Sequence, residues 1–225
     1  MQDLHLWLCS RHNIANSDHF KRQVLSRYTG VAPQDWRFSL GQHGKPGLLD
    51  SLRPLDFNLS HSGDWLACAV TAGTVVGLDL ERYDPDRDVM KLARRYFQAD
   101  EIVALQACGK VDQIARFYDY WTLKEARIKA RGAALGLELE SSGFKLDFPA
   151  NAGGVTGLGE IRENPDDLAN QAYYCVLDPV AAYRLAICWL RPAGVLPRLR
   201  LFELRGADQS EREPSQLLRA VSTPG

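Results

Sequence analysis

The sequence predicts an α+β fold, and three observations lead to this prediction. Short apolar runs bounded by glycine, proline, asparagine and serine are typical of strands, and most are close enough in sequence to form hairpins. Segments with helical periodicity gather in the middle of the chain, between residues 88 and 131. Hydrophobic residues make up 45% of the 225 residues and charged residues 24%, which is sufficient for a buried core. Helices mixed with hairpin-linked strands favour the α+β class.

The predicted strands fall into two groups, one before the helical region and one after it. Strands are expected at residues 4–9, 57–60, 65–71 and 75–80, and again at 144–148, 173–177 and 183–190. Residues 61–64 form a polar link between two of the early strands. The stretch 149–170 is rich in glycine, asparagine and proline, which predicts a surface loop. From Arg191 onward the chain is basic and then polar, which predicts a loosely ordered tail.

The helix boundaries follow from capping residues. Helices are expected at residues 18–28, 88–97, 100–109 and 112–131. Ser17 or Asp18 would cap the first of them, and Asp100 would cap the third. Gly132 would end the longest helix in the position where a left-handed residue is common.

The domain organisation predicted from these elements has two halves and a tail. The N-terminal half spans residues 1–72, the C-terminal half 73–192 and the tail 193–225. The apolar run at 65–70 is similar to the run at 184–189, which would fit two related halves, although short apolar strands often look alike.

Bulk properties disfavour several classes of function. The formal net charge of -1 indicates no general affinity for polyanions, so we expect no nucleic-acid partner. No apolar run approaches the length of a membrane span and no leader pattern begins the chain, so we expect a cytoplasmic protein without a membrane partner. The five scattered cysteines lack metal-ligand spacing, which predicts reduced and mostly buried thiols.

Two carboxylates end the predicted strand at residues 75–80. Side chains alternate along a strand, so Asp79 and Glu81 project on one side and repel each other unless a positive charge lies between them. Their oxygens suit a hard cation such as Mg²⁺. The alternative is a solvated strand end with ordinary surface acids, and this motif alone does not exclude it.

The longest predicted helix carries a second charged pair. Glu125 and Lys129 are four residues apart and share a helix face. They are either a surface ion pair of small energetic value or a third metal carboxylate with a lysine that holds a phosphate.

A third polar segment, residues 57–63, contains Ser60, His61 and Gly63 between two apolar runs. Hydroxyls, an imidazole and exposed backbone N–H groups suit a phosphate oxygen. No Gly-x-Ser-x-Gly motif occurs, which argues against a serine hydrolase. Lys45 follows Gly44 without the pattern of a phosphate-binding P-loop, so it could be only a loop lysine.

Together these segments resemble a known family. The runs Gly77-Leu78-Asp79-Leu80-Glu81 and Trp121-Thr122-Leu123-Lys124-Glu125-Ala126-Arg127-Ile128-Lys129 are similar to the two signature motifs of 4′-phosphopantetheinyl transferases. Residues 57–63 and the run Gly44-Lys45-Pro46 resemble further motifs of the surfactin-synthetase-activating branch, which is larger, single-chain and pseudo-dimeric. The resemblance covers roughly residues 41–190 and rests on four ordered motifs, which are more specific than any one of them.

The resemblance implies two similar α+β halves related by pseudo-two-fold symmetry and a magnesium-dependent transfer. The phosphopantetheine arm of coenzyme A would pass to a serine of an acyl or peptidyl carrier protein, with release of 3′,5′-ADP, and the enzyme would be a monomer. The implied metal ligands are Asp79, Glu81 and Glu125. Glu125 would also be the base, directly or through a metal-bound water, and Lys129 would assist the leaving group. The implied coenzyme A contacts are Lys45, Ser60, His61 and Lys124. Glu101 matches an acidic position near the metal waters.

The N-terminal part departs from the family pattern. Between the first strand and the helix that ends near Tyr28, members carry an extra helical stretch rich in arginine and lysine that holds the 3′-phosphate of coenzyme A. Here only a few residues follow Ser10, and Arg11, Lys21 or Arg22 would have to substitute. Two alternatives therefore stay open: a non-catalytic module that binds carrier protein or coenzyme A, and another Mg²⁺-dependent phosphoryl-transfer or hydrolytic enzyme.

Overall fold

A computed structural model describes residues 2–41, 44–49, 54–133, 138–150, 159–164, 172–190, 197–205, 208–212 and 218–222. The helices are α1 (Ser17–Leu25), α2 (Val89–Tyr96), α3 (Ala99–Gln106) and α4 (Lys110–Arg131), with 3₁₀ turns η1 (Arg11–Asn13) and η2 (Pro33–Asp35). The strands are β1 (Gln2–Ser10), β2 (Phe38–Leu40), β3 (Pro46–Leu48), β4 (Leu55–Ser62), β5 (Trp65–Ala72), β6 (Val76–Arg82), β7 (Gly143–Asp147), β8 (Gly159–Asn164), β9 (Ala172–Leu177), β10 (Tyr183–Leu190), β11 (Pro197–Arg205), β12 (Asp208–Arg212) and β13 (Leu218–Ser222). This mixture confirms the predicted α+β class.

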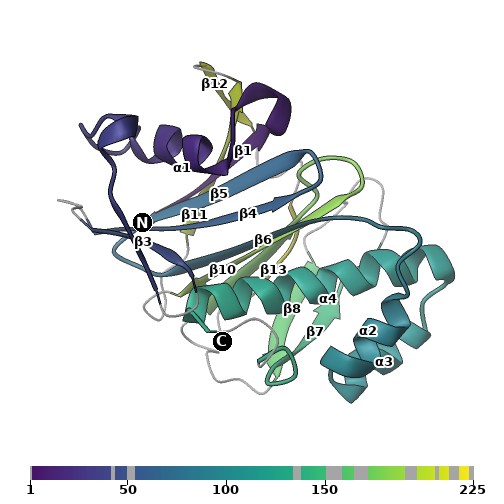
Figure 1. Cartoon of the computed structure of the whole chain (residues 1–225). Helices are drawn as coiled ribbons and strands as arrows, with labels where there is room; N and C mark the ends of the chain where they lie inside the picture. Colours follow the sequence, from purple (N-terminus) through teal and green to yellow (C-terminus); the bar gives the residue numbers. More distant parts are fainter. Residues whose placement is uncertain are drawn as a thin grey trace.

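Two sheets organise these strands (Figure 1). The five-stranded sheet has the order β12-β11-β1-β5-β4, and the six-stranded sheet has the order β6-β10-β9-β13-β8-β7. A small hairpin, β2-β3, forms a separate two-stranded sheet. Strands β4 and β6 are the edge strands of their respective sheets and run side by side. The junction between the two sheets therefore lies along β4 and β6.

Side chains that point to opposite faces of the strands pack into three separate apolar cores. In β1, Leu4, Leu6 and Leu8 point into a core shared with the six-stranded sheet, where Leu185 and Trp189 are fully buried. The intervening residues of β1 face the opposite side. Because successive side chains of a strand point to opposite faces, β1 contributes to an apolar core on each of its two faces.

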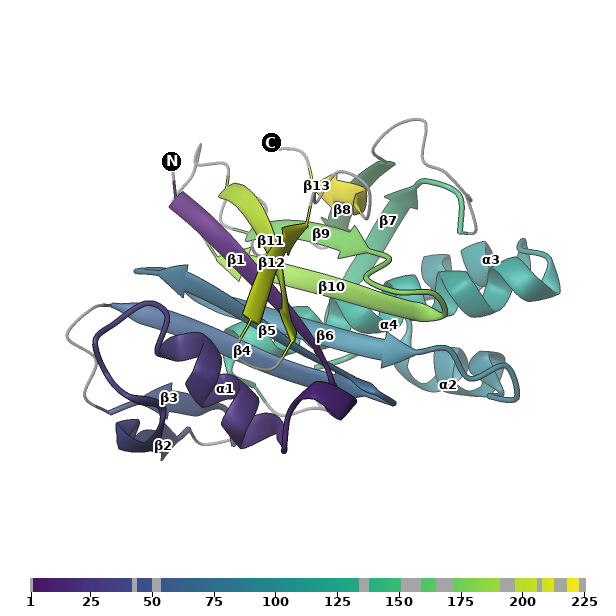
Figure 2. The ribbon, with the colours of Figure 1, turned by 90° about the horizontal axis from the view of Figure 1, so that it is seen from above.

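The outer face of each sheet is covered by helix, as Figures 1 and 2 show. Helix α1 packs Phe20, Val24 and Leu25 onto the five-stranded sheet. Helix α4 packs Leu123 and Ala126 against the six-stranded sheet, and α2 and α3 lie beside it. The chain thus stacks helix, sheet, sheet and helix, with an apolar core between each pair of layers.

Helix ends show where local prediction works and where it fails. Gly132 ends α4 with φ 65°, as expected for a left-handed residue at this position. The N-cap of α1 is Asn16, which accepts a hydrogen bond from the backbone of His19, so Ser17 and Asp18 lie inside the helix. The N-cap of α3 is Gln98, which forms a capping box with Glu101 in place of the predicted cap.

The expectation of a loosely ordered tail is wrong for the described residues. Strand β11 pairs in parallel with β1 along eight residue pairs and buries Leu201 and Leu204 completely. Strand β13 pairs with β8 and β9 in the other sheet. The C-terminal segment therefore adds strands to both sheets. Strand β8 likewise lies within residues 149–170, where a loop was expected, and the rest of that stretch after Ala150 lies outside the described residues.

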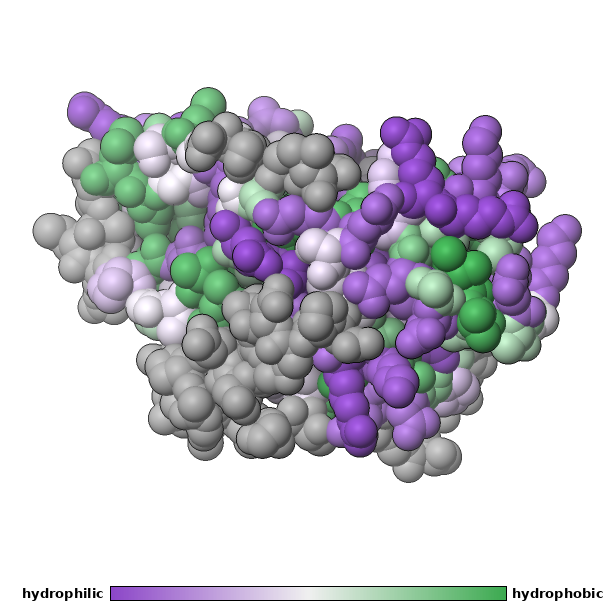
Figure 3. Space-filling model, turned by 90° about the horizontal axis from the view of Figure 1, so that it is seen from below, coloured by the Kyte–Doolittle hydropathy of each residue, from purple (hydrophilic) through white to green (hydrophobic). Residues whose placement is uncertain are grey.

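Among the described residues, no helix is both long enough and apolar enough to cross a bilayer. On the face drawn in Figure 3, hydrophilic and apolar residues are interspersed.

Candidate active site

The junction between the sheets is held by side chains of β4. Side-chain oxygens from every second residue of β4 accept hydrogen bonds from every second backbone N–H of β6. The pairs are Asp56 with Val76 (2.7 Å), Asn58 with Leu78 (2.9 Å), Ser60 with Leu80 (3.1 Å) and Ser62 with Arg82 (3.0 Å). The pairs are all 20 residues apart, so the two strands run parallel. We call this set of contacts the side-chain ladder.

The two acids of β6 lie along the ladder. Ser60 Oγ donates to Asp79 Oδ1 at 3.0 Å, and Ser62 Oγ donates to Glu81 Oε2 at 3.0 Å. Asp79 is 3% exposed, and its Oδ2 is buried without a hydrogen-bond partner among the described residues. A buried carboxylate oxygen left without a partner has lost its hydration, so it favours a positive charge or a proton nearby.

Helix α4 crosses β6 at very close range because residue 77 is glycine. A Cβ placed on Gly77 would lie 1.9 Å from the carbonyl oxygen of Ala126 and 2.4 Å from the backbone nitrogen of Ala130. Only a residue without a side chain allows this approach. As a result, Lys129 Nζ reaches Asp79 Oδ1 at 2.6 Å and Ser60 Oγ at 3.3 Å.

The acids act on one another electrostatically. Burial, together with the charges of Asp79 and Glu81, raises the pKa of Glu125 to about 7, against the opposing effect of Lys129. Burial and then Asp79 raise the pKa of Glu81, against the hydrogen bond from Ser62. The three carboxylates therefore share one region of negative potential, and Lys129 contacts Asp79 in it.

The donor set fits a hard divalent cation. Asp79 is buried and Glu81 and Glu125 are half-buried, and the pKa of each glutamate is raised by burial and by neighbouring carboxylates, so the group gains from a nearby positive charge. Carboxylate oxygens are the ligands that Mg²⁺ prefers. The unpartnered Oδ2 of Asp79 supplies one free donor atom. No group of three or more histidine, cysteine or acidic side chains among the described residues is already arranged to hold a metal ion. The acids are thus gathered, but they are not preassembled as a closed metal cage.

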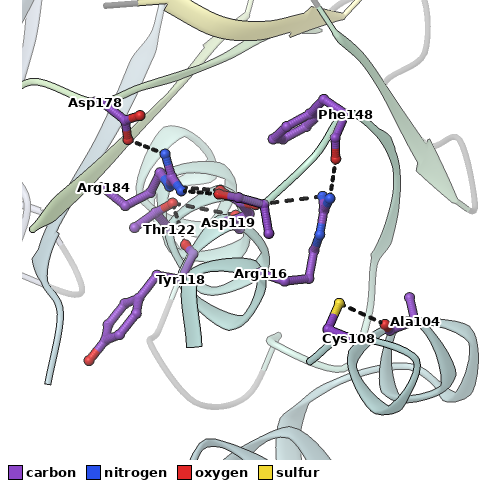
Figure 4. A network of polar contacts seen from close by, with 10 residues as sticks. Ala104, Cys108, Arg116, Tyr118, Asp119, Thr122, Phe148, Asp178 and Arg184 are labelled. Atoms are coloured by element: carbon purple, nitrogen blue, oxygen red, sulfur yellow. Dashed lines mark hydrogen bonds and ion pairs between the residues drawn. The ribbon is translucent and has the colours of Figure 1, made fainter. Parts of the chain in front are cut away.

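A buried ion network holds α4 onto the strand next to β6 (Figure 4). Arg184 of β10 pairs with Glu81 in the backbone register, and its Nε lies 2.7 Å from Asp119 Oδ1 on α4. Arg116 Nη1 lies 3.5 Å from Asp119 Oδ2, and Asp178 binds Arg184 from the other side. These contacts fix the helix that carries Glu125 relative to the strand that flanks the acids.

Comparison with known proteins identifies the family. The sequence model of the 4′-phosphopantetheinyl transferase superfamily matches residues 75–188, slightly more than half of the chain, and this range includes β6 and α4. The chain belongs to this superfamily.

Curated transferases match over longer stretches. The 4′-phosphopantetheinyl transferase Sfp of Bacillus subtilis (strain 168) is 31% identical over 181 residues, which cover 80% of this chain and 75% of that protein. The 4′-phosphopantetheinyl transferase HetI of Nostoc sp. is 39% identical over 113 residues, 49% of this chain and 48% of that one. These matches confirm the resemblance to the surfactin-synthetase-activating branch. The solved structure of Thermotoga maritima holo-[acyl-carrier-protein] synthase matches with a TM-score of 0.38 and 20% identity, over 52% of this chain and 63% of that one.

Five of the residues expected in a 4′-phosphopantetheinyl transferase site lie at the junction. Asp79, Ser60 and Lys129 are in direct contact, Glu81 is held by Ser62, and the charges of the two strand acids raise the pKa of Glu125. Lys45 lies further along the same junction, where its Nζ donates to Asp56 Oδ2 at 3.2 Å and to the carbonyl of Val76 at 3.0 Å. It supports the first contact of the ladder.

Two other residues that the transferase resemblance implied lie elsewhere. His61 is exposed and, by strand alternation, faces away from the side that carries Ser60 and Ser62. Lys124 is 0% exposed; its Nζ lies 2.9 Å from Glu101 Oε2 and also donates to two backbone carbonyls. Burial lowers the pKa of Lys124, and the charge of Glu101 opposes this shift. Within the described part of the chain, neither side chain forms a hydrogen bond or ion pair with the five residues at the junction, and the roles given them by the resemblance stay predictions.

The sequence contains an alternating pattern that indicates the ladder and that the motifs do not show. Asp56, Asn58, Ser60 and Ser62 are polar at every second position of a strand whose other face is apolar from Leu55 to Leu59. Such alternation at the edge of a sheet indicates a polar face with its own partner. Asp56, Asn58 and Ser62 are the ladder residues that this pattern could have found.

Proposed function

We propose that this protein transfers the 4′-phosphopantetheine arm of coenzyme A to a serine of an acyl or peptidyl carrier protein. The serine oxygen forms a bond to the phosphorus that bears the pantetheine arm, and the bond from that phosphorus to 3′,5′-ADP breaks. The serine proton passes to a base, and the leaving 3′,5′-ADP carries away the negative charge. Membership of the superfamily, with relatives named as transferases over most of the chain, supports this reaction.

The observation that carries the proposal is the meeting of β6 and α4. Asp79 and Lys129 are in contact at 2.6 Å although they lie 50 residues apart in sequence, and Glu81 and Glu125 share their electrostatic environment. Asp79, Glu81 and Glu125 would hold Mg²⁺, which supplies charge neutralisation to a pyrophosphate when bound. Lys129 would bind the pyrophosphate oxygens and stabilise the leaving group.

Glu125 is the residue best placed to take the serine proton. It lies on the helix that packs directly on the acid strand, and it is partly buried in a region already rich in carboxylates. A base must be within hydrogen-bond reach of the proton that it accepts, directly or through one water. The cytoplasmic location and the monomeric state stay predictions of the sequence.

The decisive experiment is transfer of the arm to an apo carrier protein, with Mg²⁺ and coenzyme A, followed by mass spectrometry. Glu125→Gln keeps the side-chain volume but removes the base and one metal charge. We expect a loss of about 10²-fold to 10⁴-fold in kcat/KM. Asp112→Asn, at the exposed start of the same helix, is the matched control and should retain activity.

Release of 3′,5′-ADP separates the alternatives. A transferase releases it only when the apo carrier is present, whereas a hydrolase of the same metal type would release it from coenzyme A alone. A binding module would release none. A folded Glu125→Gln variant with full activity would remove Glu125 from the mechanism.

A further inference from the structure

The side-chain ladder repeats one arrangement at each acid of β6. Ser60 Oγ accepts a hydrogen bond from the N–H of Leu80, the residue after Asp79, and donates to the Asp79 carboxylate. Ser62 does the same one step further, because it accepts from the N–H of Arg82 and donates to Glu81. All four donor–acceptor distances lie between 3.0 and 3.1 Å.

The direction of these hydrogen bonds is determined by the groups involved. A backbone N–H can only donate, so it occupies a lone pair of the hydroxyl, while an ionised carboxylate can only accept. The single proton of Ser62 therefore points at Glu81 and the proton of Ser60 at Asp79. Each hydroxyl holds one carboxylate oxygen against the ladder and leaves the second oxygen available, as seen for Asp79 Oδ2.

The residue types along β4 change where the acids begin. The two positions without a neighbouring acid carry Asp56 and Asn58, whose contacting oxygens accept the N–H of β6. Both positions beside an acid carry serine. A carboxylate oxygen such as that of Asp56 could accept the N–H but could not donate to another carboxylate, whereas a hydroxyl does both. Serine at these two positions can thus accept the N–H of β6 and hold an acid through one and the same oxygen atom.

We propose that Ser60 and Ser62 are positioning residues that orient the carboxylates of Asp79 and Glu81 toward a divalent cation. The inference rests on the proposed function, since it assigns the two serines to the metal acids of the same site. It differs from the coenzyme A phosphate contact that the family resemblance implies for Ser60, and it gives Ser62 a role of its own. Partners that orient metal-binding side chains change metal affinity by about 10-fold to 100-fold when they are removed.

Ser62→Ala is the sharpest test because its backbone partner, the N–H of Arg82, lies at the exposed end of the ladder and can bind water instead. Mn²⁺ binding to the whole protein, saturated with coenzyme A and without carrier protein, is measured by electron paramagnetic resonance. We expect about 10-fold to 100-fold weaker Mn²⁺ binding for Ser62→Ala. Ser62→Thr keeps the hydroxyl and should bind Mn²⁺ as tightly as the wild type. In the transfer assay, the Mg²⁺ concentration for half-maximal rate should rise while KM for coenzyme A stays unchanged.

Asn58→Ala is the matched control. It removes a ladder contact of the same kind, to the N–H of Leu78, but no acid lies beside it. It should lower the unfolding temperature and keep wild-type Mn²⁺ affinity. Two results would overturn the positioning role: equal Mn²⁺ affinity in Ser62→Ala and the wild type, or equal weakening of Mn²⁺ binding in Ser62→Ala and Asn58→Ala. In either case, transfer of the arm by the wild type would still support the proposed function. A wild type that neither binds Mn²⁺ nor transfers the arm would overturn both.

Discussion

Replacing Gly77 by alanine perturbs the contact on which the whole site depends. The added Cβ would lie 1.9 Å from the carbonyl oxygen of Ala126, 2.4 Å from the nitrogen of Ala130 and 2.9 Å from its Cα. All three atoms belong to the backbone of α4, so no side chain can rotate out of the way. The helix and the strand must separate.

The size of the separation follows from these distances. An ordinary contact for a Cβ begins at 3.4 Å, so the closest pair must move apart by about 1.5 Å. Lys129 and Glu125 move with the helix, whereas Asp79 stays with β6 and the ladder. A misplacement of about 1 Å between reacting groups can cost about 10²-fold in rate. Overpacking of this kind also costs about 1–3 kcal/mol of stability, and occasionally more.

Two measurements test this reasoning on Gly77→Ala. Transfer to an apo carrier should fall by about 10²-fold or more in kcat, and urea unfolding should show the loss of stability. Gly109→Ala, at the N-cap of the same helix, is the control, because a Cβ there meets nothing within 4 Å and φ is -63°. A Gly77→Ala variant that matches the wild type in rate and stability would refute the claim that the close contact of α4 with β6 sets the site.

Two further predictions concern buried ion pairs away from the acids. Asp119→Ala leaves the guanidinium of Arg184, 1% exposed, without its buried carboxylate, and should destabilise the fold by about 3–5 kcal/mol in urea unfolding; a loss below about 1 kcal/mol would contradict this. Lys124→Met should cost a similar amount because it leaves Glu101 charged and buried, and adding Glu101→Gln should recover much of it. If Lys124 acts only on the fold, KM for coenzyme A stays unchanged in the double variant, whereas a large rise would support the phosphate contact that the resemblance implies.

The sequence was most informative where local chemistry decides the structure. Gly132 ends α4 because a left-handed residue without a Cβ satisfies the last carbonyls of the helix. The predicted strands are present because short apolar runs between turn residues match strands that are buried on both faces. The motif acids of β6 could be found because two carboxylates on one face of a strand need a positive partner, and Lys129 provides one in the structure.

Long-range pairing explains most of what could not be predicted. Strand β11 was assigned to a tail because its arginines suggested a basic, exposed segment, although leucines alternate with them in Arg198-Leu199-Arg200-Leu201. Its partner, β1, lies at the other end of the chain, and no local pattern shows that contact. Lys124 is a similar case, since its neighbour Glu125 suggested the site, whereas about 100° of helical rotation turns it toward Glu101 in α3.

The ladder also explains why the acids lie at the junction of the sheets. Two edge strands that met by direct backbone pairing would join all strands into one continuous sheet, and the N–H groups of β6 would bind carbonyls. Side-chain acceptors on β4 satisfy those N–H groups instead, and at Ser60 and Ser62 they have a proton left for a carboxylate. The serines that hold the acids come from the five-stranded sheet, whereas β6 and α4, which carry the acids and Glu125, belong to the six-stranded half. The site is therefore complete only when both halves of the protein are held together. A change at Ser60 or Ser62 should therefore alter metal affinity, whereas a change at Asn58, whose ladder contact involves no acid, should alter stability alone.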